Sequence, residues 1–140
     1  MEQAVGEALA SEASLVLVEG AGGVLSPGPS GLPQADLFRP LHLPVLLVGD
    51  GRLGGISATL AAYESLIVRG YDVPALVTLQ DPGDEDLGHT AYFEEKLTGT
   101  GCKVIGLAPL PPQPEPLTDW LRAALPSLGQ ALDQMAAHHS

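Results

Sequence analysis

The sequence predicts an α/β fold in which a parallel sheet is flanked by helices. Two observations lead to this prediction. Short apolar runs alternate along the chain with longer segments that carry apolar residues at helical spacing. The apolar runs are also nearly continuous, which is typical of strands buried on both faces of a parallel sheet. Helices then connect successive strands by right-handed crossovers.

The first predicted strand, Leu15–Val18, follows a short amphipathic helix predicted for Glu2–Glu12. The strand ends in Glu19 and runs into Gly20-Ala21-Gly22-Gly23. Ligand sites of α/β sheets lie beyond such strand ends, and a carboxylate suits a hard cation such as Mg²⁺. A solvated glutamate beside a simple glycine turn is the alternative interpretation.

The second predicted strand, His42–Val48, repeats this arrangement, because Gly49-Asp50-Gly51-Arg52-Leu53-Gly54-Gly55 follows it. Carboxyl ends of neighbouring parallel strands meet at one edge, so Glu19 and the Arg52–Ser57 turn are expected to share a crevice. Arg52 suits an anionic or carboxylate group there, and a solvated or ion-paired arginine is the alternative. Between the two strands, a surface loop is predicted at 26–33 and one helical turn at 35–39.

The remaining elements follow from the same patterns. A helix is predicted from Gly55 to Arg69, with Gly70 after its end. The acidic loop Gln80–Asp86 lacks the ligand spacing of a calcium loop and is expected to be solvated. The other expected elements are strands at 75–79 and 103–107, helices at 89–97, 117–125 and 128–135, and an extended Pro-rich stretch at 109–116.

Composition limits the possible functions. The 140 residues fit one domain, and with six Lys and Arg against a net charge of −11 the chain is not expected to bind nucleic acid. The single cysteine, Cys102, forms no internal disulfide and is expected to be a small buried hydrophobe. No apolar run approaches the length of a membrane span, and no targeting segment is visible at the N-terminus.

Three stretches resemble dethiobiotin synthetase. They are Val18-Glu19-Gly20-Ala21-Gly22-Gly23, Leu43-Pro44-Val45-Leu46-Leu47-Val48-Gly49 and Arg52-Leu53-Gly54-Gly55-Ile56-Ser57. The run Gly49–Gly55, together with residues in 61–66 and the run 69–72, is closer to the eukaryotic bifunctional branch, in which the synthetase is joined to a diaminopelargonic acid aminotransferase. The resemblance covers roughly residues 1–122 and predicts the C-terminal half of a synthetase domain with a P-loop NTPase-like fold. Residues 123–140 are expected to form a C-terminal helix and tail or a linker.

The resemblance implies biotin biosynthesis: ATP- and Mg²⁺-dependent ureido ring closure of 7,8-diaminononanoate with CO2, in a homodimer. By position, Glu19 would be a Mg²⁺ ligand, and Gly20 and Gly23 would lie against the nucleotide. Gly22 would contact the substrate and phosphate region. The segment that would contact the carboxylate end of the diamine across the dimer interface consists of Gly54, Gly55, Ile56 and Ser57. Many family members have Asn where Ser57 stands.

The chain also departs from the family pattern. It contains no G-x-x-x-x-G-K-[ST] motif, and Leu79-Gln80-Asp81 stands where the family has its adenine-recognising Asn. These 140 residues are therefore expected to be inactive without the P-loop half. An aminotransferase domain, fused or separate, is a possible partner. The resemblance implies a mitochondrial location for the eukaryotic branch and a cytoplasmic one otherwise.

Two further interpretations stay open. In the first, the chain is a non-catalytic binding or dimerisation module of the same fold. In the second, it belongs to a related P-loop family that amidates cobyrinate-type acids. The second family adds a glutaminase domain with a nucleophilic cysteine, and Cys102 has no such sequence context.

Overall fold

The computed structural model describes residues 6–8, 10–12, 15–80, 88–112 and 116–138. The chain forms two compact units, Met1–His42 and Leu43–Ser140. The larger unit contains the sheet and most of the helices.

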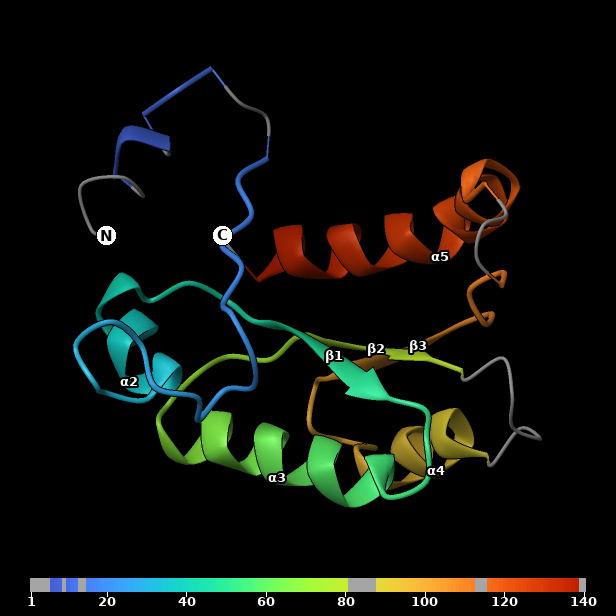
Figure 1. Ribbon diagram of the computed structural model, residues 1–140, viewed down its shortest axis with the longest axis horizontal. Helices are drawn as coiled ribbons and strands as arrows, with labels where there is room; N and C mark the ends of the chain where they lie inside the picture. Colours follow the sequence, from blue (N-terminus) through green and yellow to red (C-terminus); the bar gives the residue numbers. More distant parts are fainter. Residues whose placement is uncertain (1–5, 9, 13–14, 81–87, 113–115, 139–140) are drawn as a thin grey trace. The chain divides into compact units, whose positions relative to one another are not determined.

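The second unit is built on a parallel sheet of three strands in the order β1-β2-β3 (Figure 1). The register pairs Val48 of β1 with Val77 of β2, and Val77 with Ile105 of β3. These three residues therefore share one face of the sheet. The strands are β1 Leu46–Asp50, β2 Ala75–Leu79 and β3 Lys103–Leu107.

Helices cover both faces of this sheet. Helix α3, Gly55–Val68, connects β1 to β2, and α4, His89–Lys96, lies between β2 and β3 in the chain. Both lie on one face, and α5, Thr118–Ala137, lies on the other (Figure 1). The predicted parallel α/β architecture is confirmed, and β2, β3, α3 and α4 lie within one or two residues of their predicted bounds.

The core of this unit is divided by the sheet. On the α5 side, Val77, Ile105 and Leu107 pack with Ala124 and Ala131 of α5. The two alanines allow the helix backbone to approach the strands closely. The fully buried residues Leu76 and Phe93 belong to the side covered by α3 and α4. The sheet is thus held in place from both sides, with its carboxyl edge at the start of α3.

The first unit contains α2, Gln34–Phe38, and a 3₁₀ helix, η1, Arg39–Leu41. Together they replace the single helical turn predicted at 35–39. Gln34 ties α2 to the start of the loop at 26–33, because its backbone N–H donates to the Ser26 carbonyl at 2.9 Å. An isolated bridge between Pro27 and Pro33 closes the loop that precedes α2.

The strand predicted at Leu15–Val18 is wrong. Residues 15–20 have no regular secondary structure, and Leu17 is 74% exposed. A strand forms only where a neighbouring strand pairs with its backbone N–H and C=O groups. Within the described residues no strand pairs with this run, so its apolar composition alone does not make it a strand.

Two other boundaries differ from prediction. Strand β1 begins at Leu46 and not at His42, because His42 has a left-handed backbone with φ 50° and Pro44 follows it. The C-terminal segment is one helix where two were expected, and Pro126 lies inside it. Contacts of Ala124 and Ala131 with the sheet hold both sides of α5 and offset the hydrogen bond that the proline removes.

Some predictions concern residues that the structure does not describe. Residues 81–86 of the acidic loop and 113–115 of the Pro-rich stretch lie outside the described residues, as do residues 2–5 and 9 of the predicted N-terminal helix. The predicted boundary at residue 122 would fall within α5, and it stays a prediction. No helix in the described ranges is both long and apolar enough to cross a membrane.

Candidate functional site

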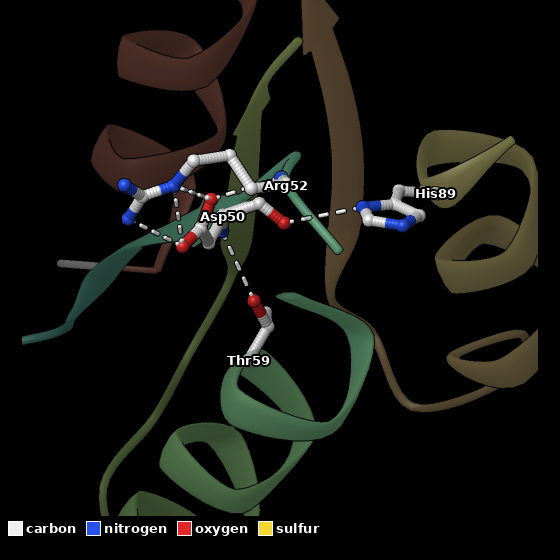
Figure 2. A network of polar contacts seen from close by, with 4 residues as sticks. All are labelled: Asp50, Arg52, Thr59 and His89. Carbon is white, nitrogen blue, oxygen red and sulfur yellow. Dashed lines mark hydrogen bonds and ion pairs between the residues drawn. The ribbon is translucent and has the colours of Figure 1, made fainter. Parts of the chain in front are cut away.

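The loop after β1 begins at Asp50, whose carboxylate is paired with Arg52 (Figure 2). The guanidinium donates from Nη2 to Oδ2 at 2.9 Å and from Nε to Oδ1 at 3.0 Å, and the Arg52 backbone N–H donates to Oδ1 at 2.9 Å. These side-chain and backbone hydrogen bonds lower the pKa of Asp50 to about 2. Of the two roles predicted for Arg52, the structure supports the ion pair within the chain.

The backbone of Asp50 is held by side chains from two helices (Figure 2). Its N–H donates to Thr59 Oγ1 of α3 at 3.1 Å, and its carbonyl lies 3.2 Å from His89 Nδ1 at the start of α4. A carbonyl can only accept, so this contact requires the proton on Nδ1 of His89. Because Thr59 and His89 are both buried, the start of the loop is fixed to the body of the fold.

Glycines set the path from Asp50 into α3. Gly54, the N-cap of α3, has φ 86°, a backbone conformation that other residues rarely adopt. At Gly55 a Cβ would overlap the carbonyl oxygen of Asp50, so only glycine allows this approach. The Gly55 N–H donates to the Arg52 carbonyl at 2.8 Å, which closes the loop.

The predicted substrate segment Gly54–Ser57 therefore forms the first turn of α3. The first N–H groups of a helix have no partner within the helix, and the dipole makes this end positive. Ser57 is exposed and its hydroxyl is not used as a cap, whereas Ile56 is half-buried. This turn has the polar groups needed to bind a carboxylate or phosphate oxygen.

His89 and Thr59 are the residues whose roles the sequence did not reveal. No Cys or His lies near His89 at the spacing of metal ligands, so the residue is not expected to bind a metal, and its contact here is with a backbone carbonyl. A second contact fixes α4 against the sheet, since the hydroxyls of Thr78 in β2 and Thr90 in α4 lie 2.8 Å apart. Two features of the sequence could have pointed to them. Thr59 is a polar residue among the apolar residues of α3, and His89 begins a helix directly after a glycine.

The other predicted site residues, Glu19, Gly20, Gly22 and Gly23, belong to the first unit. Gln34 holds their loop, because its side-chain Nε2 donates to the carbonyl oxygen of Ala21. Glu19 is exposed, and Gly22 has φ 89°. A crevice shared by Glu19 and Gly54–Ser57 stays a prediction, because the two segments belong to different units.

The donor chemistry of the first unit fits Mg²⁺. An exposed glutamate offers a hard oxygen ligand, and Mg²⁺ is usually held by one or two carboxylates together with water and phosphate oxygens. In the described part of the chain, no group of three or more His, Cys, Asp or Glu side chains lies together.

Cys102 precedes β3 and is only partly buried, where a small buried hydrophobe was expected. Burial, with the nearby charge of Asp72 as a smaller cause, raises the pKa of its thiol to about 11. Such a thiol is largely protonated at neutral pH.

Comparison with known proteins shows strong similarity to dethiobiotin synthetases. The chain is 53% identical over 108 residues to the mitochondrial bifunctional dethiobiotin synthetase/7,8-diamino-pelargonic acid aminotransferase of Arabidopsis thaliana, a match that covers 76% of this chain and 12% of the relative. A bifunctional dethiobiotin synthetase/adenosylmethionine-8-amino-7-oxononanoate aminotransferase of Emericella nidulans is 52% identical over 101 residues, with 70% and 12% covered.

A bacterial relative has a single synthetase function in its name. The ATP-dependent dethiobiotin synthetase BioD of Phenylobacterium zucineum is 42% identical over 91 residues, covering 64% of this chain and 39% of the relative. The resemblance seen in the glycine motifs is thus confirmed, although the chain spans only a part of each of these relatives.

The family assignment rests on a family sequence model, whose match covers more of the chain than the matches to these three relatives do. The sequence model of one family of P-loop NTPase-like domains matches residues 1–116, which include both glycine loops and all three strands. The chain belongs to this family, which is described as the AAA domain family.

Proposed function

We propose that this chain is the C-terminal half of a dethiobiotin synthetase domain and supplies part of its active site. The observation that carries the proposal is the Asp50–Ser57 loop, which Thr59 and His89 fix at the carboxyl edge of the sheet. Similarity to synthetases from plants, a fungus and bacteria supports the assignment.

In this proposal the first turn of α3 binds the carboxylate end of 7,8-diaminononanoate. Backbone N–H groups at Ile56 and Ser57 point toward the N-terminal end of the helix, where an anion is stabilised. The exposed Ser57 hydroxyl can donate one further hydrogen bond. The paired Asp50 and Arg52 keep the loop in place and leave recognition to the helix end.

The first unit would hold the nucleotide side of the reaction. Glu19 would ligate Mg²⁺, and the loop of Gly20, Gly22 and Gly23 would lie against phosphate oxygens, because it carries no side chains to obstruct them. When bound, Mg²⁺ would neutralise the charge that builds up on the phosphates.

The reaction joins the two amines through one carbon. One amine of the diamine attacks CO2 and forms a carbamate, and the carbamate oxygen accepts the γ-phosphate of ATP. The second amine then closes the ureido ring and releases phosphate, with ADP as the other product. The P-loop that cradles ATP in this chemistry would come from the other half of the domain.

The same proposal includes the assembly. A homodimer would bring Gly54–Ser57 of one subunit to the substrate of the other, and an aminotransferase domain would supply the diamine. The bifunctional relatives support such a fusion, and the names of the plant relatives support a mitochondrial location.

The test is reconstitution. The chain, mixed with the preceding part of the synthetase domain of the Arabidopsis thaliana relative, is supplied with the diamine, bicarbonate and MgATP, and dethiobiotin is measured. Product is expected from the mixture and from neither part alone. Glu19→Gln should remove activity and weaken the dependence on Mg²⁺, whereas Glu64→Gln, at an exposed position on α3, should leave both unchanged.

Calorimetric titration separates the synthetase from a binding module of the same fold. Diamine binding by the reconstituted pair that depends on ATP supports the synthetase. Binding that is unchanged by ATP, with no dethiobiotin formed, would reject the synthetase and leave the binding module.

A further inference from the structure

The segment that follows Glu19 is tied to the first turn of α2, within the same unit of the chain (Figure 1). The backbone N–H of Gln34 donates to the Ser26 carbonyl at 2.9 Å. The N–H of Ala35 donates to the Val24 carbonyl, also at 2.9 Å. The first N–H groups of a helix have no partner within the helix, and these two loop carbonyls satisfy two of them. Both contacts lie beyond the glycine run.

The side chain of Gln34 reaches further back, into the glycine run itself. Its Nε2 donates to the carbonyl oxygen of Ala21, and only the nitrogen of the amide can make this bond, because both oxygens are acceptors. Gln34 is only 8% exposed, and a buried amide is unfavourable unless it is hydrogen-bonded. The contact with Ala21 therefore accounts for a polar side chain at a buried position of α2.

Gly20 provides the space in which the Gln34 amide lies. A Cβ added at Gly20 would overlap Oε1 of Gln34 and would lie 3.1 Å from its Cδ. Gly20 does not have a positive φ, in contrast to Gly22, whose φ is 89°. The backbone at Gly20 is thus open to other residues, and it is the amide of Gln34 that excludes a side chain there. A ligand would contact Gly20 through its backbone.

The glycine run requires such an anchor. Residues 20–23 contain three glycines and belong to no helix or strand. Glycine loses more conformational freedom on folding than any other residue, so an ordered glycine run depends on contacts from outside. Glu19 directly precedes the run, and the direction of its carboxylate therefore depends on the backbone that Gln34 holds. A binding group displaced by about 1 Å can lower a rate roughly a hundredfold.

We propose that Gln34 is a positioning residue of the synthetase site. Its amide fills the side-chain space of Gly20 and holds the Ala21 carbonyl, and in this way it fixes the backbone that presents Glu19. Gln34 acts through this loop and not on a reacting atom. The inference deepens the proposed function and rests on it, because it takes residues 19–23 as the nucleotide side of the site.

A positioning role and a merely structural role predict different losses. If Gln34 only stabilised the fold, its removal would affect both substrates alike. Positioning of residues 19–23 predicts a loss on the nucleotide side alone. The reason is that the segment at 54–57, proposed for the diamine, follows a loop that is held by Thr59 and His89 and not by Gln34.

The first test measures the steady-state kinetics of the reconstituted synthetase. Gln34→Met keeps the length of the side chain and removes its donor. The KM for MgATP is expected to rise at least tenfold, while the KM for the diamine changes less than twofold. Gln130→Met, at an exposed position of α5, is the matched control and should leave both KM values unchanged. Calorimetric titration with MgADP should show the same tenfold loss of affinity without turnover.

Gly20→Ala tests whether the two residues act as one unit. Its methyl group displaces the flexible end of the Gln34 side chain, so the KM for MgATP should rise as it does in Gln34→Met. The variant that combines both changes should then be no worse than either single variant, within twofold. If the two effects multiply, Gly20 acts on the nucleotide independently of Gln34, and the inference is overturned.

A carbonyl resonance reports the contact in the full chain without any ligand. Ala21-Gly22 is the one Ala-Gly pair of the sequence, so ¹³C-labelled alanine carbonyls and ¹⁵N-labelled glycines give a single signal for this peptide bond. Loss of the hydrogen bond should move the carbonyl signal upfield by similar amounts in Gln34→Met and Gly20→Ala. The signal should stay in place in Gln130→Met. A signal that moves in neither of the first two variants would overturn the inference.

These outcomes differ from failure of the proposed function. If dethiobiotin forms and Gln34→Met leaves the KM for MgATP unchanged or raises both KM values together, the synthetase proposal stands and the inference is overturned. If no dethiobiotin forms, the synthetase proposal fails, and the MgADP titration decides the inference. A tenfold loss of MgADP affinity in Gln34→Met then supports positioning, whereas equal affinity or no MgADP binding overturns it.

Discussion

The runs Leu15–Val18 and Ala75–Leu79 are both rich in Leu and Val, yet only the second is a strand. Ala75–Leu79 forms β2, pairs with a strand on each side and is covered by helices on both faces. Leu15–Val18 has no regular structure, and most of it is exposed. The difference shows that apolar composition favours a strand only where other strands and helices surround it.

The largest effect is expected from removing an apolar side chain in each run. Leu76→Ala leaves a cavity at a fully buried site and should cost about 2–5 kcal/mol of unfolding free energy. Leu17→Ala, at an exposed site, should change it by less than about 0.5 kcal/mol. Urea unfolding checks both. Equal losses would mean that Leu15–Val18 is buried and would remove the contrast between the two runs.

The same contrast between surroundings applies to single glycines. Gly55→Ala places a methyl group against the Asp50 carbonyl oxygen and should destabilise the fold by about 1–3 kcal/mol. In α5, a Cβ at Gly129 meets no atom within 4 Å, so Gly129→Ala should stabilise by about 0.5–1 kcal/mol. Thermal unfolding should shift in opposite directions. A shift of the same sign in both variants would contradict the crowding at Gly55.

A moderate effect is expected at His89. His89→Ala removes the donor to the Asp50 carbonyl and leaves a buried gap, at a cost of about 1–3 kcal/mol. His138→Ala is the control, because His138 pairs with Asp72 in an exposed contact of 2.9 Å and should contribute less than about 1 kcal/mol. Urea unfolding of both variants measures the difference. A smaller loss at His89 than at His138 would rule out the proposed anchoring of the loop.

The smallest effect is the acid sensitivity of the Asp50–Arg52 pair. Since the folded pKa of Asp50 is about 2 and its ordinary value is 3.8, the pair stabilises fully above pH 3.8 and loses its contribution as the pH falls through about 2. The pair is exposed, so the loss should stay below about 1 kcal/mol.

Comparison with Asp50→Asn isolates this effect. The stability difference between the unaltered chain and the variant, measured by urea unfolding, should shrink between pH 4 and pH 2. A difference that is constant over this range would show that the carboxylate does not titrate with the expected pKa.

Much of the second unit could be predicted from the sequence. Strands β2 and β3 and helices α3 and α4 have strong local signals, such as the short apolar runs of the strands and the Arg69-Gly70 end of α3. Where local signals conflicted with tertiary contacts, prediction failed. Two helices were expected at 117–125 and 128–135, but packing of α5 on the sheet holds one helix continuous through Pro126.

The candidate site could be predicted only in part. Glycine spacing identified the loop that leads into α3, because a tight turn and a close backbone approach leave a local signature. The roles of His89 and Thr59 could not be found this way. Their hydrogen bonds to Asp50 join positions 39 and 9 residues apart, and such contacts depend on how the helices pack.

Because Asp50 and Arg52 neutralise each other, the loop before α3 adds little local charge, and the net charge of the whole chain decides how fast a charged ligand associates. Helix N-termini attract anions only over a short range, and the chain as a whole carries a net charge of −11. At long range, an anionic ligand is therefore repelled. Added salt shortens the range of this repulsion to about 8 Å at physiological ionic strength. Association of a carboxylate or nucleotide should therefore become faster as the salt concentration is raised.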